Sequence, residues 1–462
     1  AAGTAASPGA ASGPLVLTAN AAIAAAESGT PAILALREVL PRDLDGVVTA
    51  AGLLTSHGGG TSHAALAARA AGTPSVTGVA DLFVDSEAVH FGSRSVKAGE
   101  WLTVDGATGQ IYPGRSVITQ PPGANYLDRL LAWADGVREL GVWANADTAR
   151  AAAIARDAGA DGIGLARTEY MFHGERLAVV RRILLSVDER DRDEALEELE
   201  SLQIEDFVEL LEAMDGTPVV VRLLDPPVHE FLPSHLDVEH EIAARRAAEQ
   251  PIDDLEKLDA AIENWAEVNP MLGLRGVRLA VVIPEIYRVQ VLAALEAVRR
   301  RLDAGGDPRL ELMIPLVGSV EELHLVRDMI EEEVHSAGRL LEIAIGTMIE
   351  LPRAALVAGA LALESDFFSF GTNDLTQTTM GLSRDDAEEA FLRSYIDQGL
   401  LPVNPFQQID PLGVGSLMRQ AIAAGREANP GLEIGVCGEH GGDPTSIGPF
   451  HRWGVDYVSS SP

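Results

Sequence analysis

The feature that most limits the possible folds is a regular alternation of short apolar runs and amphipathic stretches from about residue 126 onward. Helical patterns such as Thr148–Ala158, Ile286–Leu302 and Val320–Ala337 separate many of the apolar runs. Eight strands joined by helical crossovers predict a closed parallel (β/α)8 barrel of the TIM type. An open doubly wound sheet is the alternative, and the sequence lacks the Gly-rich dinucleotide fingerprint that would favour it. The expected strands are Val142–Ala146, Gly162–Ala166, Val219–Leu224, Leu312–Val317, Ile343–Ile349, Phe367–Phe370, Ile434–Cys437 and Tyr457–Ser459.

The residues before this alternation predict a second, smaller domain of mixed α/β class. They contain short β-like runs at Leu15–Leu17 and Trp101–Val104 and a helical pattern at Ala64–Ala71. A polar, proline-bearing stretch over 120–125 has the composition of a linker. We therefore expect an α/β domain over 1–116, a linker over 117–127 and the barrel over 128–462, the barrel without its last helix. A long excursion over 225–276 follows the third strand, and insertions of that size usually form lids or dimer surfaces.

Composition narrows the function classes. The formal net charge of −34 argues against nucleic acid or an anionic membrane as a partner. Cys437 is the only cysteine, so no intrachain disulfide forms and a reducing cytoplasm is expected. No apolar run reaches membrane-spanning length.

One glycine-rich loop precedes a histidine. Gly58, Gly59 and Gly60 are followed by two hydroxyl residues and then by His63, where the helical pattern begins. A ring at that point lies near the N–H groups and the positive dipole end of a helix, which suits an imidazole nucleophile whose product carries phosphate. The alternative is a glycine-rich turn with an incidental histidine.

Basic side chains recur at the ends of the expected strands. Arg167 ends the second strand, Arg222 ends the third, and Arg275 closes the excursion that follows. Guanidinium groups converging on one mouth suit a small substrate that carries both carboxylate and phosphate. Taken singly, each arginine could instead be a surface ion-pair partner.

Two acids and one thiol also lie at the ends of expected strands. Glu350 and Asp374 come at neighbouring strand ends, where two carboxylates can share a hard cation such as Mg²⁺; the alternative is that they neutralise the arginines. Glu439 and Asp443 are supporting candidates near the same face. Cys437 ends the seventh strand, where a thiol can donate a proton to a carbanion or enolate, although a lone cysteine is usually a small buried hydrophobe.

Together these residues resemble the phosphoenolpyruvate-utilising enzymes, most closely the dikinases among them. The matching motifs keep the family's order along almost the whole chain. They are Thr-Ser-His-Ala-Ala at 61–65, Gly-Leu-Ala-Arg-Thr-Glu at 164–169, Arg-Leu-Leu-Asp-Pro-Pro at 222–227, Asn-Pro-Met-Leu-Gly at 269–273, Gly-Thr-Met-Ile-Glu at 346–350, Gly-Thr-Asn-Asp-Leu-Thr-Gln at 371–377 and Cys-Gly-Glu-His-Gly-Gly at 437–442.

The resemblance implies a phosphotransferase that interconverts pyruvate and phosphoenolpyruvate. It implies that His63 is a phosphohistidine on a swivelling domain and that Cys437 protonates C3 of the enolate. It further implies a homodimer through the barrel and, in a longer protein, an N-terminal domain for ATP and phosphate. The implied ligand-binding residues are Arg167, Arg222 and Arg275 for the substrate, Glu350 and Asp374 for Mg²⁺, Gly371, Thr372 and Asn373 along the site, and Arg384 for the phosphoryl group.

Three departures from the family pattern bear on this expectation. His57 and Gly60 stand where the family commonly has an arginine and a larger residue, and Tyr170 stands where the dikinases usually have histidine. No ATP-binding loop is present, so we expect a fragment that carries out the half-reaction between phosphohistidine and pyruvate. Phosphoenolpyruvate synthase, Enzyme I of the sugar phosphotransferase system and a non-catalytic phosphoenolpyruvate-binding module are the alternatives.

Overall fold

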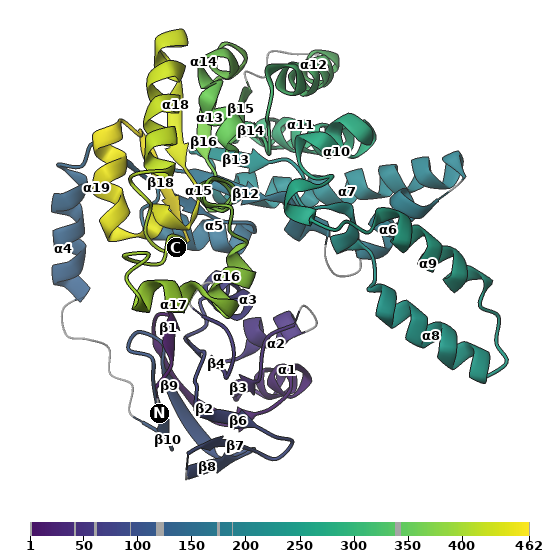
Figure 1. Cartoon of the computed structure of the whole chain (residues 1–462), viewed down its shortest axis with the longest axis vertical. Coiled ribbons are helices and arrows are strands. Elements are labelled where there is room, and N and C mark those ends of the chain that lie inside the picture. Colours follow the sequence, from purple (N-terminus) through teal and green to yellow (C-terminus); the bar gives the residue numbers. More distant parts are fainter. Residues whose placement is uncertain are drawn as a thin grey trace. The chain divides into compact units, whose positions relative to one another are not determined.

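The computed structural model describes residues 2–40, 43–59, 62–92, 94–116, 124–172, 176–186, 188–337 and 343–461. The chain forms two compact units, one comprising residues 1–138 and the other residues 139–460 (Figure 1). Residues 117–123 of the expected linker lie outside the described part. Helix α4 (Ala124–Asp135), which begins within the expected linker, belongs to the first unit.

The first unit is a mixed α/β domain, as the sequence predicts. Its main sheet has the order β1-β5-β4-β3-β2-β9-β10, with a parallel centre and antiparallel edges. The strands are β1 (Thr4–Ser7), β2 (Ala10–Val16), β3 (Ile33–Leu36), β4 (Gly52–Thr55), β5 (Ser75–Thr77), β9 (Trp101–Asp105) and β10 (Gln110–Pro113). A separate three-stranded sheet contains β6 (Leu82–Val84), β7 (Ala88–Phe91) and β8 (Arg94–Lys97).

Three short helices cover one face of this sheet, and small side chains let them approach closely. They are α1 (Ala19–Glu27), α2 (Leu44–Thr49) and α3 (His63–Ala70). A Cβ on Gly46 would lie 2.5 Å from the Cα atom of Ala19, so only glycine permits this crossing of α1 and α2. The alanines of the helices pack on Leu34 and Leu53 of the sheet. Small alanine side chains let these helices pack closely, which accounts for the alanine-rich composition of the region.

The second unit is a closed barrel of eight parallel strands, which confirms the predicted fold. Each strand pairs with its neighbours in chain order, and β11 closes the circle with β18. All eight predicted strands are present, with ends that differ by at most a few residues. The strands are β11 (Gly141–Asn145), β12 (Ile163–Arg167), β13 (Pro218–Arg222), β14 (Arg309–Ile314), β15 (Ala344–Ile349), β16 (Phe367–Phe370), β17 (Glu433–Val436) and β18 (Tyr457–Ser460).

Large side chains fill the barrel interior. The rings of Trp143 and Tyr457 stack with centroids 4.0 Å apart. A Cβ on Gly435 would lie 2.1 Å from Tyr457 Cζ, so this glycine makes room for the ring. Met313 and Met348 complete the same buried cluster. The barrel is a packed core, and its strand ends are available for a site.

Helices surround the barrel and bury the outward face of each strand (Figure 1). None of the helices in the described part of the chain combines the length and apolar character needed to cross a bilayer. The α-helices of the second unit that lie outside the 225–276 excursion, apart from the short α10, are α5 (Ala149–Asp157), α6 (Leu177–Leu185), α7 (Glu189–Ala213), α11 (Pro284–Asp303), α12 (Val320–Ser336), α13 (Pro352–Leu356), α14 (Ala358–Leu361), α15 (Thr372–Met380), α16 (Arg384–Ala390), α17 (Leu392–Asp397), α18 (Val414–Ala428) and α19 (Pro444–Trp453).

The long excursion contains two charged helices that lie side by side, α8 (His235–Ala247) and α9 (Asp253–Trp265). Figure 1 shows this pair extending away from the barrel. Glu249 has a φ of 53° and Pro251 follows it, so the chain turns between the helices. The excursion then returns to the barrel through α10 (Val277–Val282).

A partly buried acid in β14 makes the free energy of unfolding depend on pH. Burial, with the nearby carboxylates of Glu433 and Asp366, raises the pKa of Glu311 to about 7. In the unfolded chain this carboxyl has its ordinary pKa. Between the two pKa values the folded state therefore binds more protons than the unfolded state. The free energy of unfolding therefore falls as pH rises through that window.

We expect Glu311→Gln to stabilise the protein at about pH 8 by about 1–3 kcal/mol and to have little effect at about pH 5, where the acid is already protonated. Urea denaturation of both proteins at the two pH values measures this difference. An equal effect at both values would contradict the assigned pKa.

Candidate active site

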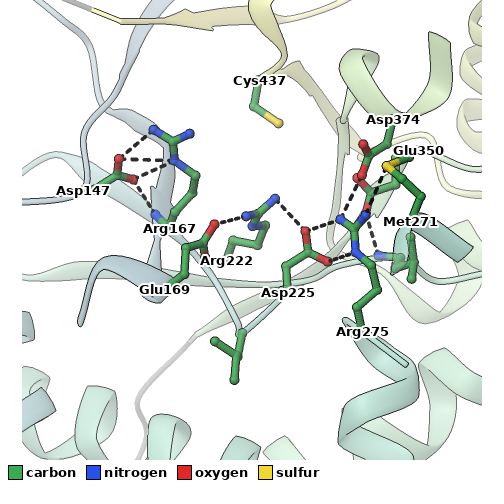
Figure 2. A network of polar contacts seen from close by, with 12 residues as sticks. Asp147, Arg167, Glu169, Arg222, Asp225, Met271, Arg275, Glu350, Asp374 and Cys437 are labelled. Carbon is green, nitrogen blue, oxygen red and sulfur yellow. Dashed lines mark hydrogen bonds and ion pairs between the residues drawn. The ribbon is translucent and has the colours of Figure 1, made fainter. Parts of the chain in front are cut away.

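The carboxyl ends of the barrel strands gather the predicted site residues at one face. Arg167 and Arg222 are the last residues of β12 and β13, and Glu350 and Cys437 directly follow β15 and β17. Asp374 lies in the first turn of α15, just after β16. Figure 2 shows these side chains around one region, with the thiol of Cys437 pointing toward it.

A chain of alternating charges crosses this face. Glu169 binds Arg222, and Arg222 Nη1 lies 3.1 Å from Asp225 Oδ2. The same carboxylate receives two contacts from Arg275, from Nη2 at 2.5 Å and from Nε at 3.3 Å. Arg275 Nη2 also lies 2.9 Å from Asp374 Oδ2. Each charge except those at the ends therefore has an opposite charge on both sides (Figure 2).

Asp225 is the central member of this chain and is only 2% exposed. Burial opposes its charge, but Arg222 and Arg275 outweigh burial and lower the pKa of the carboxyl. Helix α11 fixes the backbone beside it: Tyr287 donates its hydroxyl to the Leu224 carbonyl at 2.5 Å, and Gln290 Oε1 accepts the Leu224 N–H at 2.9 Å. Asp225 is thus held from its backbone as well as from its carboxylate.

Arg222 also carries an unused donor. Its Nε is buried without a hydrogen-bond partner in the described part of the chain, and so is Oε2 of the neighbouring Glu169. Buried polar atoms in native proteins are almost always paired, so such orphans point to an absent ligand or water.

Arg167 belongs to a separate ion pair. Asp147, just after β11, accepts the Arg167 backbone N–H at 2.8 Å and contacts the guanidinium at 2.7 Å. The guanidinium also lies over the ring of Tyr170, 5.2 Å from its centroid. Tyr170, the departure noted in the sequence, therefore contacts one of the predicted substrate arginines.

Glu350 is a buried carboxylate, 1% exposed. Its Oε1 accepts the N–H of Leu316 at 2.6 Å, and Leu316 has a φ of 59°, a conformation that costs a residue with a Cβ about 1–3 kcal/mol. A Cβ on Gly371 would lie 2.7 Å from Glu350 Oε2, so this position needs glycine. Burial and the charge of Asp374 raise the pKa of Glu350 well above its ordinary value.

These two carboxylates carry oxygen donors of the kind that a hard cation prefers. Two neighbouring acids repel each other when both are ionised, and this repulsion adds to burial, the larger cause, in raising the pKa of Glu350. Carboxylate oxygens, completed by water and substrate, suit Mg²⁺. No group of three or more His, Cys, Asp and Glu side chains within the described ranges is arranged to hold a metal. Glu350 and Asp374 fit a cation that obtains its remaining ligands elsewhere.

The two residues before Asp374 serve the site differently. Thr372 is fully buried, and its hydroxyl lies 2.8 Å from Nδ1 of His440, behind the site. Asn373 Oδ1 accepts the N–H of Glu439 at 3.0 Å, which leaves the N–H groups of that amide as donors. One oxygen of Asp443, Oδ2, accepts the hydroxyls of both Thr445 and Ser446 near the start of α19, so this supporting candidate has a local role.

Cys437 is a buried neutral thiol, 3% exposed. Burial raises its pKa to about 11, so the group keeps its proton at neutral pH. Its backbone carbonyl accepts Nδ2 of Asn145 at 3.0 Å, and Asn145 Oδ1 accepts the Ser459 hydroxyl at 2.6 Å. The first and last strands therefore fix the position of the cysteine.

Arg384 lies at the start of α16. Its backbone N–H donates to Gln377 Oε1 at 2.8 Å. Its guanidinium lies 5.9 Å from the ring centroid of Phe406, and Nη2 is buried without a partner among the described residues. An unpartnered guanidinium nitrogen is a donor that an anionic ligand could use.

The predicted nucleophile lies in the first unit, where helix α3 begins at His63. Ser62 caps the helix, because its hydroxyl accepts the Ala65 N–H at 3.4 Å and donates to the Gly59 carbonyl at 2.8 Å. Gly58 has a φ of 99°, which favours glycine in the loop. Gly60, Thr61 and the side chain of His63 lie outside the described part.

Sequence reasoning missed several residues of this site, among them Asp147, Glu169, Asp225, Gln377 and His440. Asp147 directly follows the first expected strand, and Asp225 follows the third expected strand. The rule that selected the arginines could therefore have found both. Gln377 and His440 stand within the quoted motifs, but nothing in the sequence assigns their partners.

Comparison with known proteins matches both units to one family. The description "PEP-utilising enzyme, mobile domain" matches residues 29–109, and "PEP-utilising enzyme, PEP-binding domain" matches residues 123–462. A chloroplastic pyruvate, phosphate dikinase from Flaveria pringlei is 45% identical over 468 residues, covering 100% of this chain and 48% of the relative.

Bacterial relatives of the same name are equally similar. The one from Rhizobium meliloti is 45% identical, covering 100% of this chain and 51% of its own. The one from Clostridium symbiosum is 43% identical, covering 99% and 52%. The chain thus spans about half the length of the curated relatives it matches.

The raised pKa of Cys437 predicts slow alkylation. We expect iodoacetamide to modify the native protein only slowly at about pH 8, because the thiol is both buried and neutral, and to modify it fully in denaturant. Mass spectrometry of the intact chain measures the modified fraction. Rapid modification of the native protein would show an exposed or ionised thiol and contradict the geometry described above.

Proposed function

Because the chain belongs to the phosphoenolpyruvate-utilising enzymes, we propose that it transfers a phosphoryl group between His63 and pyruvate, interconverting pyruvate and phosphoenolpyruvate. One observation carries the proposal: Arg222 and Arg275 share the buried carboxylate of Asp225 beside Glu350 and Asp374. Fixed guanidinium groups next to two oxygen ligands match a substrate with a carboxylate, an enol oxygen and a phosphoryl group.

The arginines and one amide bind the substrate in this proposal. Arg222 supplies its unused Nε, and Arg275 faces the metal-binding side of the site. Arg167 and the N–H groups of Asn373 offer further donors, and Arg384 contacts the phosphoryl group with its unpartnered Nη2. Gly371 and Thr372 shape the wall without offering a side-chain donor.

Glu350 and Asp374 would hold Mg²⁺. When bound, the ion supplies positive charge beside the substrate oxygens, where phosphoryl transfer needs it. The orientation of the two carboxylates comes from the chain: the Leu316 N–H holds Glu350, while Arg275 and Gln377 hold Asp374.

In this proposal His63 accepts or donates the phosphoryl group, and Cys437 donates or accepts the proton. In the direction from phosphoenolpyruvate, the ester P–O bond breaks and a P–N bond to His63 forms, which leaves an enolate. The Cys437 thiol, neutral at physiological pH, gives its proton to C3 and completes pyruvate. The thiolate then regains a proton from solvent, and the reverse direction exchanges these roles.

His63 must approach the barrel from its own domain. We assign residues 1–116 to a swivelling phosphohistidine domain, 117–127 to its hinge and 128–462 to the barrel.

In a longer protein, ATP and phosphate would phosphorylate His63 at another domain, and the barrel would form a homodimer. A single cysteine fits work in the cytoplasm.

The first test is transfer itself. Incubation with labelled phosphoenolpyruvate and Mg²⁺ should place one acid-labile phosphate on His63 and release one pyruvate per chain. His63→Asn should abolish both products, whereas His90→Gln, which changes an exposed histidine of the same unit, should abolish neither. Peptide mass spectrometry and a coupled pyruvate assay measure the outcome. Substrate binding without transfer in the wild type would instead favour a non-catalytic binding module.

The second test concerns the metal. Glu350→Gln should remove the increase in thermal midpoint that Mg²⁺ with phosphoenolpyruvate gives the wild type, because one ligand is lost. The metal-free variant should be at least as stable as the wild type, since a neutral amide replaces a buried acid with a raised pKa. Calorimetry with Mg²⁺ and with EDTA distinguishes the two effects. A retained Mg²⁺ response would exclude Glu350 as a ligand.

A further inference from the structure

Arg384 lies on a segment that is built almost as a separate piece. Residues 381–413, hereafter the Arg384 arm, connect α15 to α18 and contain α16 and α17. The arm has its own small core, in which Ala387, Leu392 and Phe406 are buried together. Asn404 joins α16 to the segment that follows α17, donating to Glu388 Oε1 at 2.7 Å and accepting the Phe406 N–H at 2.8 Å. Such a piece needs specific contacts to face the barrel in one orientation.

Gln377 supplies the first contact. Its Oε1 accepts the backbone N–H of Arg384 at 2.8 Å, while its Nε2 donates to Asp374 Oδ1 at 3.1 Å and lies 3.3 Å from Met271 Sδ. An amide can make the first two bonds only in this orientation, with the oxygen toward the arm and the nitrogen toward the carboxylate. One side chain thus joins the arm to a proposed metal ligand.

His440 supplies the second contact. Its ring is fully buried, with Nε2 lying 2.8 Å from the Pro405 carbonyl and Nδ1 lying 2.8 Å from the Thr372 hydroxyl. Because a carbonyl can only accept, Nε2 carries a proton and donates it to Pro405. The neutral ring then accepts the Thr372 hydroxyl at Nδ1. The neighbour of Pro405 is Phe406, whose ring lies against the Arg384 guanidinium.

The two contacts start from the same part of the barrel and reach both ends of the arm. Gln377 lies on α15 beside Asp374, and His440 holds Thr372 at the first residue of that helix. Glycine allows the second arrangement, because a Cβ on Gly438 would lie 2.0 Å from Thr372 Oγ1. Movement of the arm would therefore break bonds to the residues that surround the proposed metal.

We propose that Gln377 and His440 are positioning residues that fix the Arg384 arm to the end of β16, so that the guanidinium of Arg384 faces the transferring phosphoryl group. The inference rests on the proposed function, because it assigns Arg384 to that group. Neither residue touches substrate. His440 acts on the reaction through Arg384, and Gln377 does so in addition to holding Asp374.

A double-mutant cycle tests the proposal. Gln377→Met removes both bonds of that amide. His440→Leu removes both ring contacts, and His440→Gln can accept from Thr372 and donate to Pro405 as the ring does. Gln398→Met, on an exposed part of the arm, is the matched control. Each is made in the wild type and with Arg384→Ala, and single-turnover release of pyruvate is followed against phosphoenolpyruvate concentration.

We expect Gln377→Met and His440→Leu to lower the single-turnover rate by about 5–20-fold at subsaturating substrate, and His440→Leu to lower it by less than about twofold when Arg384 is already alanine. The loss from Gln377→Met should also be smaller in that background, and the part that remains is due to the lost donor to Asp374. His440→Gln should recover most of the rate, and Gln398→Met should behave as the wild type. Equal losses in both backgrounds would show that the residues do not act through Arg384 and would overturn the proposal. If His440→Leu fails to fold, Gln377→Met in the two Arg384 backgrounds still completes a cycle.

A second readout does not depend on turnover. Amide hydrogen exchange of α16 and α17 should be faster in Gln377→Met and His440→Leu than in the wild type, while exchange in the strands of the barrel is unchanged. Unchanged exchange in the arm would overturn the positioning role even if activity fell. A wild type that releases no pyruvate would refute the proposed function, and the exchange result would still decide whether these residues anchor the arm.

Discussion

The site depends on one buried carboxylate shared by two arginines. Asp225 lies between Arg222 and Arg275, whose guanidinium groups would otherwise repel each other at the mouth of the barrel. Removing one member of such a buried network leaves the remaining charges uncompensated, which typically costs about 3–5 kcal/mol. Because Tyr287 and Gln290 also fix the backbone beside Asp225, the cationic groups face the site before any substrate arrives.

In the proposed function, this arrangement would let a strongly acidic protein bind an anion. The net charge of −34 opposes an anionic substrate at long range. The local field differs, because carboxylates such as Asp147 and Asp225 hold the guanidinium groups in fixed positions inside a low-dielectric site. Preorganised charge of this kind stabilises the charge of a migrating phosphoryl group without reorganisation at the moment of reaction.

Much of the fold could be predicted from the sequence, because parallel strands buried on both faces read as continuous apolar runs. The strand over Phe367–Phe370 has the predicted bounds, and the arginines and acids were found by their position at strand ends. The pairing of the site's side chains with one another was not predictable from the sequence. Arg167 pairs with Asp147, which follows a neighbouring strand of the barrel. Thr372 pairs with His440, which lies far from it in the sequence. Residues 117–123 of the proposed hinge, and Gly60 and Thr61 of the glycine-rich loop, lie outside the described residues, so the expectations for them stay predictions.

The most direct measurement of the central claim is calorimetric titration of phosphoenolpyruvate into a His63→Ala chain, which binds substrate at equilibrium without turnover. The account predicts one site per chain that requires Mg²⁺, and an affinity at least about tenfold lower when Asp225→Asn is added, with Arg222 and Arg275 still present. An unchanged affinity in a folded Asp225→Asn protein would contradict it, because the arginines would then bind substrate without the carboxylate that holds them.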